Sequence, residues 1–198
     1  IAKKTFEIRM PFSPQEKMNV HILAKKGSLK NVKIGNWRAK RIDTDVSGLQ
    51  PKVVEFMRFN KRFSTTCGYI QPNEIMDGDN IVVLSNVIRD RQTNNVVDTP
   101  ASTCMESGVI EVSKKYFDEM TIPKRVFVMC HEYCHYNEQT RDEFRCDAFA
   151  LQCYRALGFP PVEAIYSFTD MFKGYNLSNP EIEKRIEAMF KLVKRNYA

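Results

Sequence analysis

The most constraining feature of this chain is an apolar stretch that leads into two histidines four positions apart. Residues 122–130 read Ile-Pro-Lys-Arg-Val-Phe-Val-Met-Cys and are followed by His131, Glu132 and, two residues later, His135. The end of this stretch is apolar on almost every side, which predicts a buried helix. Polar side chains in a buried helix need partners. Two histidines and a glutamate in such a helix therefore favour a bound metal ion.

The spacing of the histidines suits one metal ion. A helix turns by roughly 100° per residue, so side chains four apart project from one face, a turn apart. One zinc ion can then accept both His131 and His135. Glu132 flanks this face near a metal-bound water without ligating the ion, so it is the expected general base. The alternative is that the histidines only satisfy hydrogen bonds of the core.

A zinc site of this kind needs a third protein ligand, and we expect it to be Glu143. Asp147 follows four residues later on the same face of the next predicted helix, where it can accept the free N–H of a ligand histidine. Residues Thr140 to Glu143 also match a capping box, in which Glu143 would reach back to the helix start. Glu138, Asp142 and Asp147 stay open as alternative ligands.

The cysteines favour an intracellular, cytoplasmic type of protein. Four of the six lie in two predicted helices, whereas small disulfide-stabilised domains usually carry theirs in loops. We therefore expect reduced, mostly buried thiols. A structural zinc site that combines cysteines with histidine is an alternative, and it would leave Glu132 without a role. The four cysteines are Cys130, Cys134, Cys146 and Cys153.

Composition and charge add further limits. The 198 residues, 43% of them hydrophobic and 27% charged, suit a globular protein with one core. No apolar run approaches the roughly 20 residues of a membrane span, and the N-terminus lacks the pattern of a signal peptide. Residues 1–62 carry 15 Lys and Arg against 5 Asp and Glu. Within them, Lys25–Arg41 is a basic run that can face nucleic acid or another anionic partner, although solvated surface is the simpler interpretation.

The apolar pattern predicts the α+β class, with the last third of the chain helical. Strands are expected over residues 5–12, 81–87 and 108–113. Helices are expected over residues 14–26, 50–63, 114–120, 123–138, 141–157, 161–173 and 179–196.

Several motifs together resemble a family of metallopeptidases. H-E-x-x-H is followed by E-F-R-C-D-A-F-A over residues 143–150, by S-N-P over residues 178–180, and by R-I at residues 185 and 186. This set is similar to the peptidase core of gluzincins, above all the family of the CAAX prenyl protease and the heat-shock membrane protease. The likeness covers about residues 108–190. The short spacing between the second histidine and the glutamate also resembles the anti-repressor-type (ImmA/IrrE-like) gluzincins.

The resemblance implies a zincin-like helical peptidase core over residues 108–198, with a short edge strand or small sheet. Residues 1–107 would form a basic α/β portion of unknown fold, either an adaptor or a part of the same domain. The resemblance and the motif predict a zinc-dependent endopeptidase, with a metal-activated water and Glu132 as general base. A peptide substrate can pair with residues 108–113 if that strand is an exposed edge.

Oxyanion stabilisation needs one more donor beside the metal. The candidates are Arg185 and Tyr175, followed by Tyr136 and Asn179.

Other classes of function stay open. A catalytically silent binding or assembly protein with the peptidase fold, such as a component of a larger particle, is the main alternative. Glu132 argues against it, because a silent site need not keep its base. A nucleic-acid-binding protein that uses Lys25–Arg41 is the other, and Trp37 alone does not make a base-stacking platform.

Overall fold

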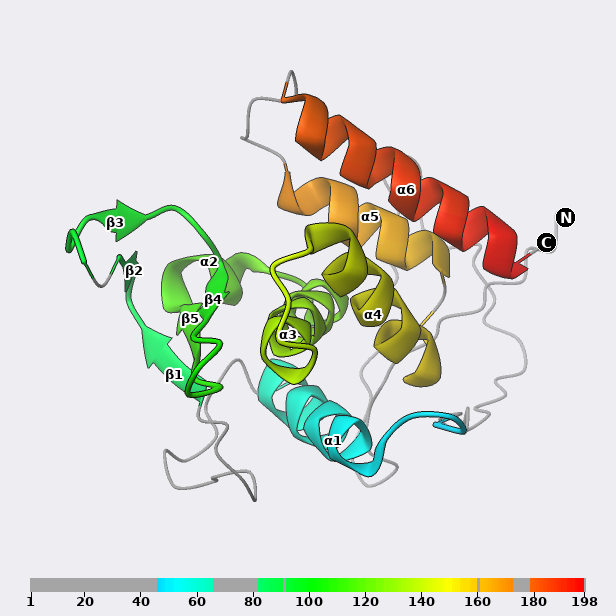
Figure 1. Ribbon diagram of the computed structural model, residues 1–198, viewed down its shortest axis with the longest axis horizontal. Coiled ribbons are helices and arrows are strands. Elements are labelled where there is room, and N and C mark those ends of the chain that lie inside the picture. The colour runs from blue at the N-terminus through cyan, green and yellow to red at the C-terminus, as the bar shows by residue number, and fades with distance from the viewer. Residues whose placement is uncertain (1–45, 66–81, 91, 160, 173–178, 198) are drawn as a thin grey trace, which may run out of the picture.

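A computed structural model describes residues 46–65, 82–90, 92–159, 161–172 and 179–197. Mixed helices and small sheets confirm the α+β class (Figure 1). The elements are α1 (Pro51–Thr65), β1 (Val82–Ser85), β2 (Ile88–Arg89), β3 (Val96–Val97), β4 (Ala101–Thr103), β5 (Ile110–Ser113), α2 (Lys114–Glu119), α3 (Ile122–Asn137), α4 (Glu143–Ala156), α5 (Pro161–Met171) and α6 (Pro180–Tyr197). The strand and helix expected over 5–12 and 14–26, and the basic run Lys25–Arg41, lie outside the described residues.

Helix α3 is the central element of the fold. It packs against α1, α4, α5 and β4, and Figure 1 shows it between α1 and α4 with the strands to one side. Five consecutive residues, Val126 to Cys130, are buried, so every face of this part of the helix contacts protein. The apolar stretch in the sequence therefore forms the buried helix that it predicted, and His131 follows it at only 8% exposure.

The larger sheet has the strand order β1-β5-β4. Strand β5 pairs in parallel with β1 and antiparallel with β4. Peptide pairing with residues 108–113 was predicted on the condition that this strand is an exposed edge, and the condition is not met, because β5 has a partner on each side. Among the described residues the edge beside α3 is β4, which contacts that helix.

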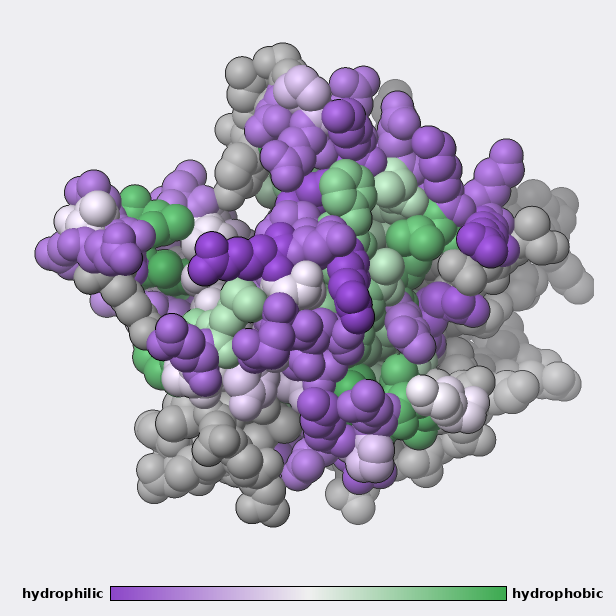
Figure 2. Space-filling model, viewed as in Figure 1, coloured by the Kyte–Doolittle hydropathy of each residue, from purple (hydrophilic) through white to green (hydrophobic). Residues whose placement is uncertain are grey.

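A second, two-stranded sheet stands apart from the helices. Strands β2 and β3 form this antiparallel pair, and Figure 1 shows it at the far end of the strand region. Val96 and Val97 are 55% and 39% exposed there, and Figure 2 shows hydrophobic surface on this projection. The sequence did not predict these two short strands or β4.

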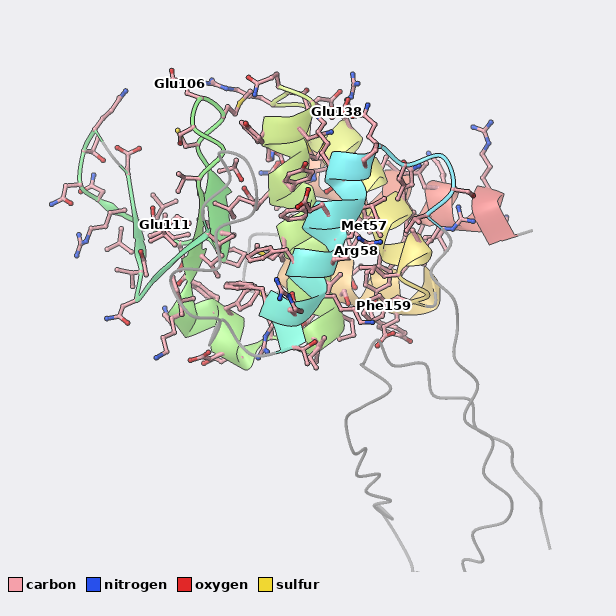
Figure 3. All side chains as sticks on the ribbon, turned by 90° about the horizontal axis from the view of Figure 1, so that it is seen from below. Met57, Arg58, Glu106, Glu111, Glu138 and Phe159 are labelled. Atoms are coloured by element: carbon pink, nitrogen blue, oxygen red, sulfur yellow. The ribbon has the colours of Figure 1, made fainter. Side chains whose placement is uncertain are left out.

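Residues on both sides of position 108 pack as one body. The Phe56 ring of α1 stacks on Tyr133 of α3 with ring centroids 3.9 Å apart, and Asn60 Nδ2 donates to the Val126 carbonyl at 2.9 Å. Figure 3 shows α1, marked by Met57 and Arg58, in front of the other helices, with the strand that carries Glu111 to one side. A boundary at residue 108 would cut the β1-β5-β4 sheet. The described part of residues 46–107 thus belongs with the helical core.

Arg125 joins the ends of two helices inside this body. Its Nε donates to Phe117 O at 2.7 Å, and its Nη1 donates to Ser64 O at 3.0 Å. Nη2 donates to Asp118 O at 3.2 Å. Carbonyls near a helix C-terminus carry partial negative charge, so this buried cation stabilises the ends of α1 and α2.

The start of α4 differs from the expected capping box. Asp142 is the N-cap residue, and its Oδ1 accepts from Phe144 N at 3.0 Å and Arg145 N at 3.2 Å. Thr140 Oγ1 accepts from Asp142 N instead of capping the helix. The capping-box alternative for Glu143 is therefore wrong, and this side chain lies against α3 instead, as the contacts below show.

The structure agrees with two further expectations from the sequence, one on membrane-spanning helices and one on disulfides. No described helix combines the length and apolar character needed to cross a membrane. The five described cysteines form no disulfide, as expected for the four in α3 and α4.

Candidate metal centre

The two histidines of the H-E-x-x-H motif converge on one point. His131 and His135 project from α3 one turn apart, and their Nε2 atoms lie 3.2 Å from each other. Their ring centroids are 4.9 Å apart and the ring planes meet at 78°. Ligand atoms of both histidines and a carboxylate oxygen of Glu132 all lie within 4.8 Å of one another. The helix therefore presents these groups together, as the spacing predicted.

Glu143 brings a carboxylate to the same point from the next helix. Its Oε2 lies 3.3 Å from His131 Nε2, and its Oε1 lies 3.6 Å from His135 Nε2. The turn between α3 and α4 is tight because Gln139 adopts a left-handed conformation with φ of 48°. Thr140 N then bonds back to His135 O at 3.1 Å. This turn lets the first residue of α4 face the end of α3.

The outer nitrogens of both imidazoles meet acceptors. His135 Nδ1 lies 2.8 Å from the Thr140 carbonyl oxygen. A carbonyl only accepts, so this nitrogen carries the proton. His131 Nδ1 lies 2.9 Å from Asp147 Oδ1, an ion-pair contact in which the ring N–H does not point straight at the oxygen. A carboxylate at that distance likewise favours the proton on Nδ1.

With both imidazoles protonated on Nδ1, the lone pairs of their Nε2 atoms face each other and the Glu143 carboxylate. With protons on both Nδ1 atoms, the Nε2 atoms of His131 and His135 and the two carboxylate oxygens of Glu143 are all acceptors. Acceptors that converge at 3.2–3.6 Å repel one another unless a cation or protons lie among them. Donor atoms about 2.0–2.2 Å from a tetrahedral zinc ion lie about 3.3–3.6 Å from each other. The three side chains therefore fit a zinc ion.

The shifted pKa values of the two histidines and of Glu143 also show that positive charge is favoured at this point. Burial lowers the pKa of His131, but contacts with Asp147 and Glu143 outweigh it and raise this pKa to about 10. Contact with Cys146 raises the pKa of His135 to about 8 despite burial. The His131 contact lowers the pKa of Glu143 to about 2, against the opposing effect of burial. Without a metal, protons on the imidazoles supply the charge that the carboxylates require.

Arg185 from α6 binds both carboxylates of the cluster. Its Nη1 lies 2.8 Å from Glu143 Oε2, while its Nε and Nη2 donate to the two oxygens of Asp147 at 2.8 Å each. The Arg185 side chain is 13% exposed. A two-point contact between guanidinium and carboxylate fixes orientation as well as distance. Arg185 therefore holds two side chains in place: Asp147, which contacts the outer nitrogen of His131, and Glu143, which faces both Nε2 atoms.

Glu132 has a partner that the sequence did not indicate. Thr103 Oγ1, on β4, lies 2.8 Å from Glu132 Oε2 and 2.9 Å from the Glu132 carbonyl oxygen. Both residues are half-buried. The three-residue strand that carries Thr103 has no recognisable apolar pattern, so only the pairing of β4 with β5 brings it to α3.

The alternative ligands have other contacts. Glu138 forms an ion pair with Arg145, and Asp142 caps α4. Asp147 faces Nδ1 of His131 rather than Nε2. Glu143 is thus the carboxylate that approaches both Nε2 atoms.

Two of the three remaining oxyanion candidates lie in the described residues, and they differ in their surroundings. Asn179 Oδ1 accepts from Glu181 N at 3.0 Å at the start of α6, and Asn179 is exposed. Tyr136 is half-buried and packs against the hydrophobic core. Tyr175 lies outside the described residues.

The cysteines lie away from the Nε2 atoms. Cys146 Sγ is 3.4 Å from His135 Nδ1, the outer nitrogen of that ring. Contact with the Cys134 thiol and burial raise the pKa of Cys146, which disfavours the thiolate that zinc binds. Cys130 Sγ instead accepts from Asn60 Nδ2 at 3.2 Å. In the described residues, the only group with the arrangement of a metal site is His131, Glu132 and His135, which Glu143 approaches from α4.

Comparison with known proteins does not extend this assignment, because no family model, curated protein or solved structure matches the chain. The resemblance to gluzincins rests on the motifs of the sequence.

Proposed function

We propose that this chain is a zinc-dependent endopeptidase, with His131, His135 and Glu143 as metal ligands and Glu132 as general base. The observation that carries the proposal is the convergence of two Nε2 atoms and one carboxylate at 3.2–3.6 Å. Glu132 lies in the same cluster, on α3, with its own hydroxyl partner. Because Glu143 approaches both Nε2 atoms from α4, we assign it as the third ligand and give Glu132 the role of the base.

The donor set favours zinc in a catalytic role. Imidazole and carboxylate donors suit zinc, and catalytic zinc sites combine three protein ligands with one open position. Structural zinc sites are instead closed by four ligands and are rich in thiolates. When bound, zinc supplies Lewis acidity and lowers the pKa of a water molecule to about 7.

Within this proposal each side chain has a defined task. The Glu132 carboxylate accepts the proton of the attacking water and delivers it to the leaving amine. Asp147 and the Thr140 carbonyl keep the imidazole protons on the outer nitrogens. Arg185 holds Glu143 and Asp147, so we assign it a positioning role in place of the oxyanion role. Tyr136, Tyr175 and Asn179 remain the candidates for oxyanion stabilisation.

Strand β4 is the proposed docking edge for an extended peptide. Ser113 N donates to Pro100 O, and Cys104 N donates to Val109 O, both at 2.8 Å. In an antiparallel pair alternate residues bond to the partner strand, so the backbones of Ala101 and Thr103 point away from β5. Ala101 is buried and its carbonyl accepts from Thr99 Oγ1 at 2.9 Å, so half-buried Thr103 is the position that can pair with a peptide. A peptide that adds to this edge would run beside α3. The proposed docking position is therefore Thr103 on β4, in place of residues 108–113.

The proposal is tested by zinc content and peptide hydrolysis of three proteins. These are the wild type, Glu132→Gln and the matched surface control Glu119→Gln, each assayed on casein and on a broad library of quenched fluorescent peptides. We expect one zinc per chain in all three, and a loss of about 10²–10⁴-fold in rate for Glu132→Gln alone. A wild type that binds one zinc yet cleaves no faster than Glu132→Gln would show a silent binding or assembly protein instead.

A further inference from the structure

A hydroxyl on the proposed docking strand contacts the proposed base. Thr103 is the last residue of β4, and its Oγ1 lies 2.8 Å from Glu132 Oε2 and 2.9 Å from Glu132 O. A threonine hydroxyl has one proton, so it donates to one of these oxygens at a time. Both acceptors belong to Glu132. The contact therefore ties one residue of the sheet to one residue of the motif.

We propose that Thr103 is a positioning residue for Glu132, so that the strand that docks an extended peptide also orients the base. This inference rests on the proposed peptidase function. Glu132 is half-buried, and its carboxylate lies at the end of a flexible side chain. The β-branched side chain of Thr103, in contrast, has a restricted χ1 angle in a strand. A stiff donor that holds Oε2 confines the carboxylate near the imidazoles, where a water must lose its proton.

The backbone of the same residue gives the coupling to substrate. Thr103 occupies one of the β4 positions whose backbone points away from β5, as the bonds on either side of it indicate. A peptide that pairs with this edge is thus bonded to the residue that holds Glu132. Geometry errors of about 1 Å at a reacting group can cost about 10²-fold in rate, so a shared anchor for substrate and base matters for the chemical step.

A purely structural role predicts a different result. If Thr103 only fastened β4 to α3, its loss would lower stability and weaken peptide binding without a specific change in turnover. If it positions the base, its loss lowers kcat at an unchanged KM, because the interaction matters only in the transition state. A conservative serine variant separates the two cases further. It keeps the hydroxyl that contacts Glu132 but has a freer χ1 angle, so a positioning role predicts that most of kcat, though not all of it, is recovered.

The experiment uses the full zinc-loaded chain and the library peptide that the wild type cleaves fastest. Thr103→Val, Thr103→Ser and the matched control Thr65→Val, which loses a hydroxyl bonded within α1, are compared for kcat, KM, zinc content and thermal midpoint. We expect kcat of Thr103→Val to fall about 10–100-fold with KM changed less than about threefold. Thr103→Ser should recover most of kcat, and Thr65→Val should match the wild type.

The outcomes separate this inference from the proposed function. An active wild type that depends on Glu132, together with a folded Thr103→Val of unchanged kcat, overturns the inference and leaves the function standing. A wild type without activity overturns both. If Thr103→Val does not fold, Thr103→Ala replaces it, and equal kcat for the alanine and serine variants overturns the inference.

Discussion

His131 Nε2 and His135 Nε2 lie 3.2 Å apart, and each ring turns its other nitrogen toward an oxygen acceptor. The two rings therefore offer lone pairs to a common point, to which Glu143 adds two more acceptor oxygens. Such a cluster needs positive charge between its members. The predictions below follow from this requirement and from the side chains that hold the cluster in place.

Glu143→Gln should weaken zinc binding, while Glu138→Gln should not. An amide oxygen carries no full charge and is a poor zinc ligand, so we expect a loss of more than about 100-fold in affinity at position 143. Glu138 pairs with Arg145 on the surface and serves as the matched control. Competition with a fluorescent zinc chelator measures both. Equal losses in the two variants would remove Glu143 from the ligand set.

Arg185→Met should destabilise the metal-free protein. It leaves the carboxylates of Glu143 and Asp147 without their shared cation, and Asp147 is only 4% exposed at its side chain. Losing one partner of a mostly buried ion pair costs about 3–5 kcal/mol, and we expect about 2–4 kcal/mol because Glu143 is 35% exposed. Urea denaturation measures the change.

The control for this prediction is Lys191→Met. Lys191 pairs with Glu187 along the exposed face of α6, with side chains 78% and 60% exposed. Such surface pairs contribute about 0–1 kcal/mol. An Arg185→Met protein as stable as Lys191→Met would show that the guanidinium does not hold the cluster together.

Zinc affinity should rise with pH, while the stability of the metal-free protein falls. Zinc requires neutral imidazoles, and in the metal-free protein His131 has a pKa of about 10 and His135 of about 8. Zinc must therefore displace protons, and its affinity should increase steadily between about pH 6.5 and 8.5.

The sign for stability is the opposite. A histidine whose folded pKa exceeds about 6.5 adds stability that is complete below that pH and is lost as pH rises through the folded value. For His135 the loss falls between about pH 6.5 and 8, and for His131 it continues toward pH 10. Urea denaturation in a chelating buffer at several pH values tests this. Affinity and stability that both stay flat over this range would contradict the proton-filled cluster.

The thiols should play no part in metal binding. Cys134 and Cys146 are fully buried, and the Cys146 sulfur contacts the outer nitrogen of His135. Cys134→Ala should retain one zinc per chain, and the four cysteines of α3 and α4 should react with a thiol reagent only after unfolding. Zinc analysis and mass mapping of the labelled cysteines check both points. Loss of zinc from folded Cys134→Ala would favour the mixed cysteine and histidine site.

Local patterns in the sequence predicted much of the helical half. The helix predicted over residues 123–138 matches α3 (Ile122–Asn137) to within a residue at each end, because burial on every face of its first half leaves a continuous apolar signal. Glu143 and Asp147 were placed on one helix face by their spacing of four. The role of Asp142 as the N-cap was missed, since Thr140 offered an equally good capping pattern three residues before a glutamate.

Long-range pairing was the part that the sequence could not supply. Strand β4 has three residues and becomes recognisable only through its bonds to β5. The contact of Thr103 with Glu132 depends on that pairing, and the contacts of Arg185 depend on how α6 packs on α4. A motif names the groups that carry chemistry, whereas the residues that orient them come from distant parts of the chain.

The most direct test is a crystal structure of the zinc-loaded protein with data collected at the zinc absorption edge. We predict one anomalous peak about 2.0–2.2 Å from His131 Nε2, His135 Nε2 and a Glu143 oxygen, with one position open to solvent. A peak ligated by cysteine sulfur, a closed four-ligand site, or imidazoles that diverge in the zinc-loaded protein would contradict the account.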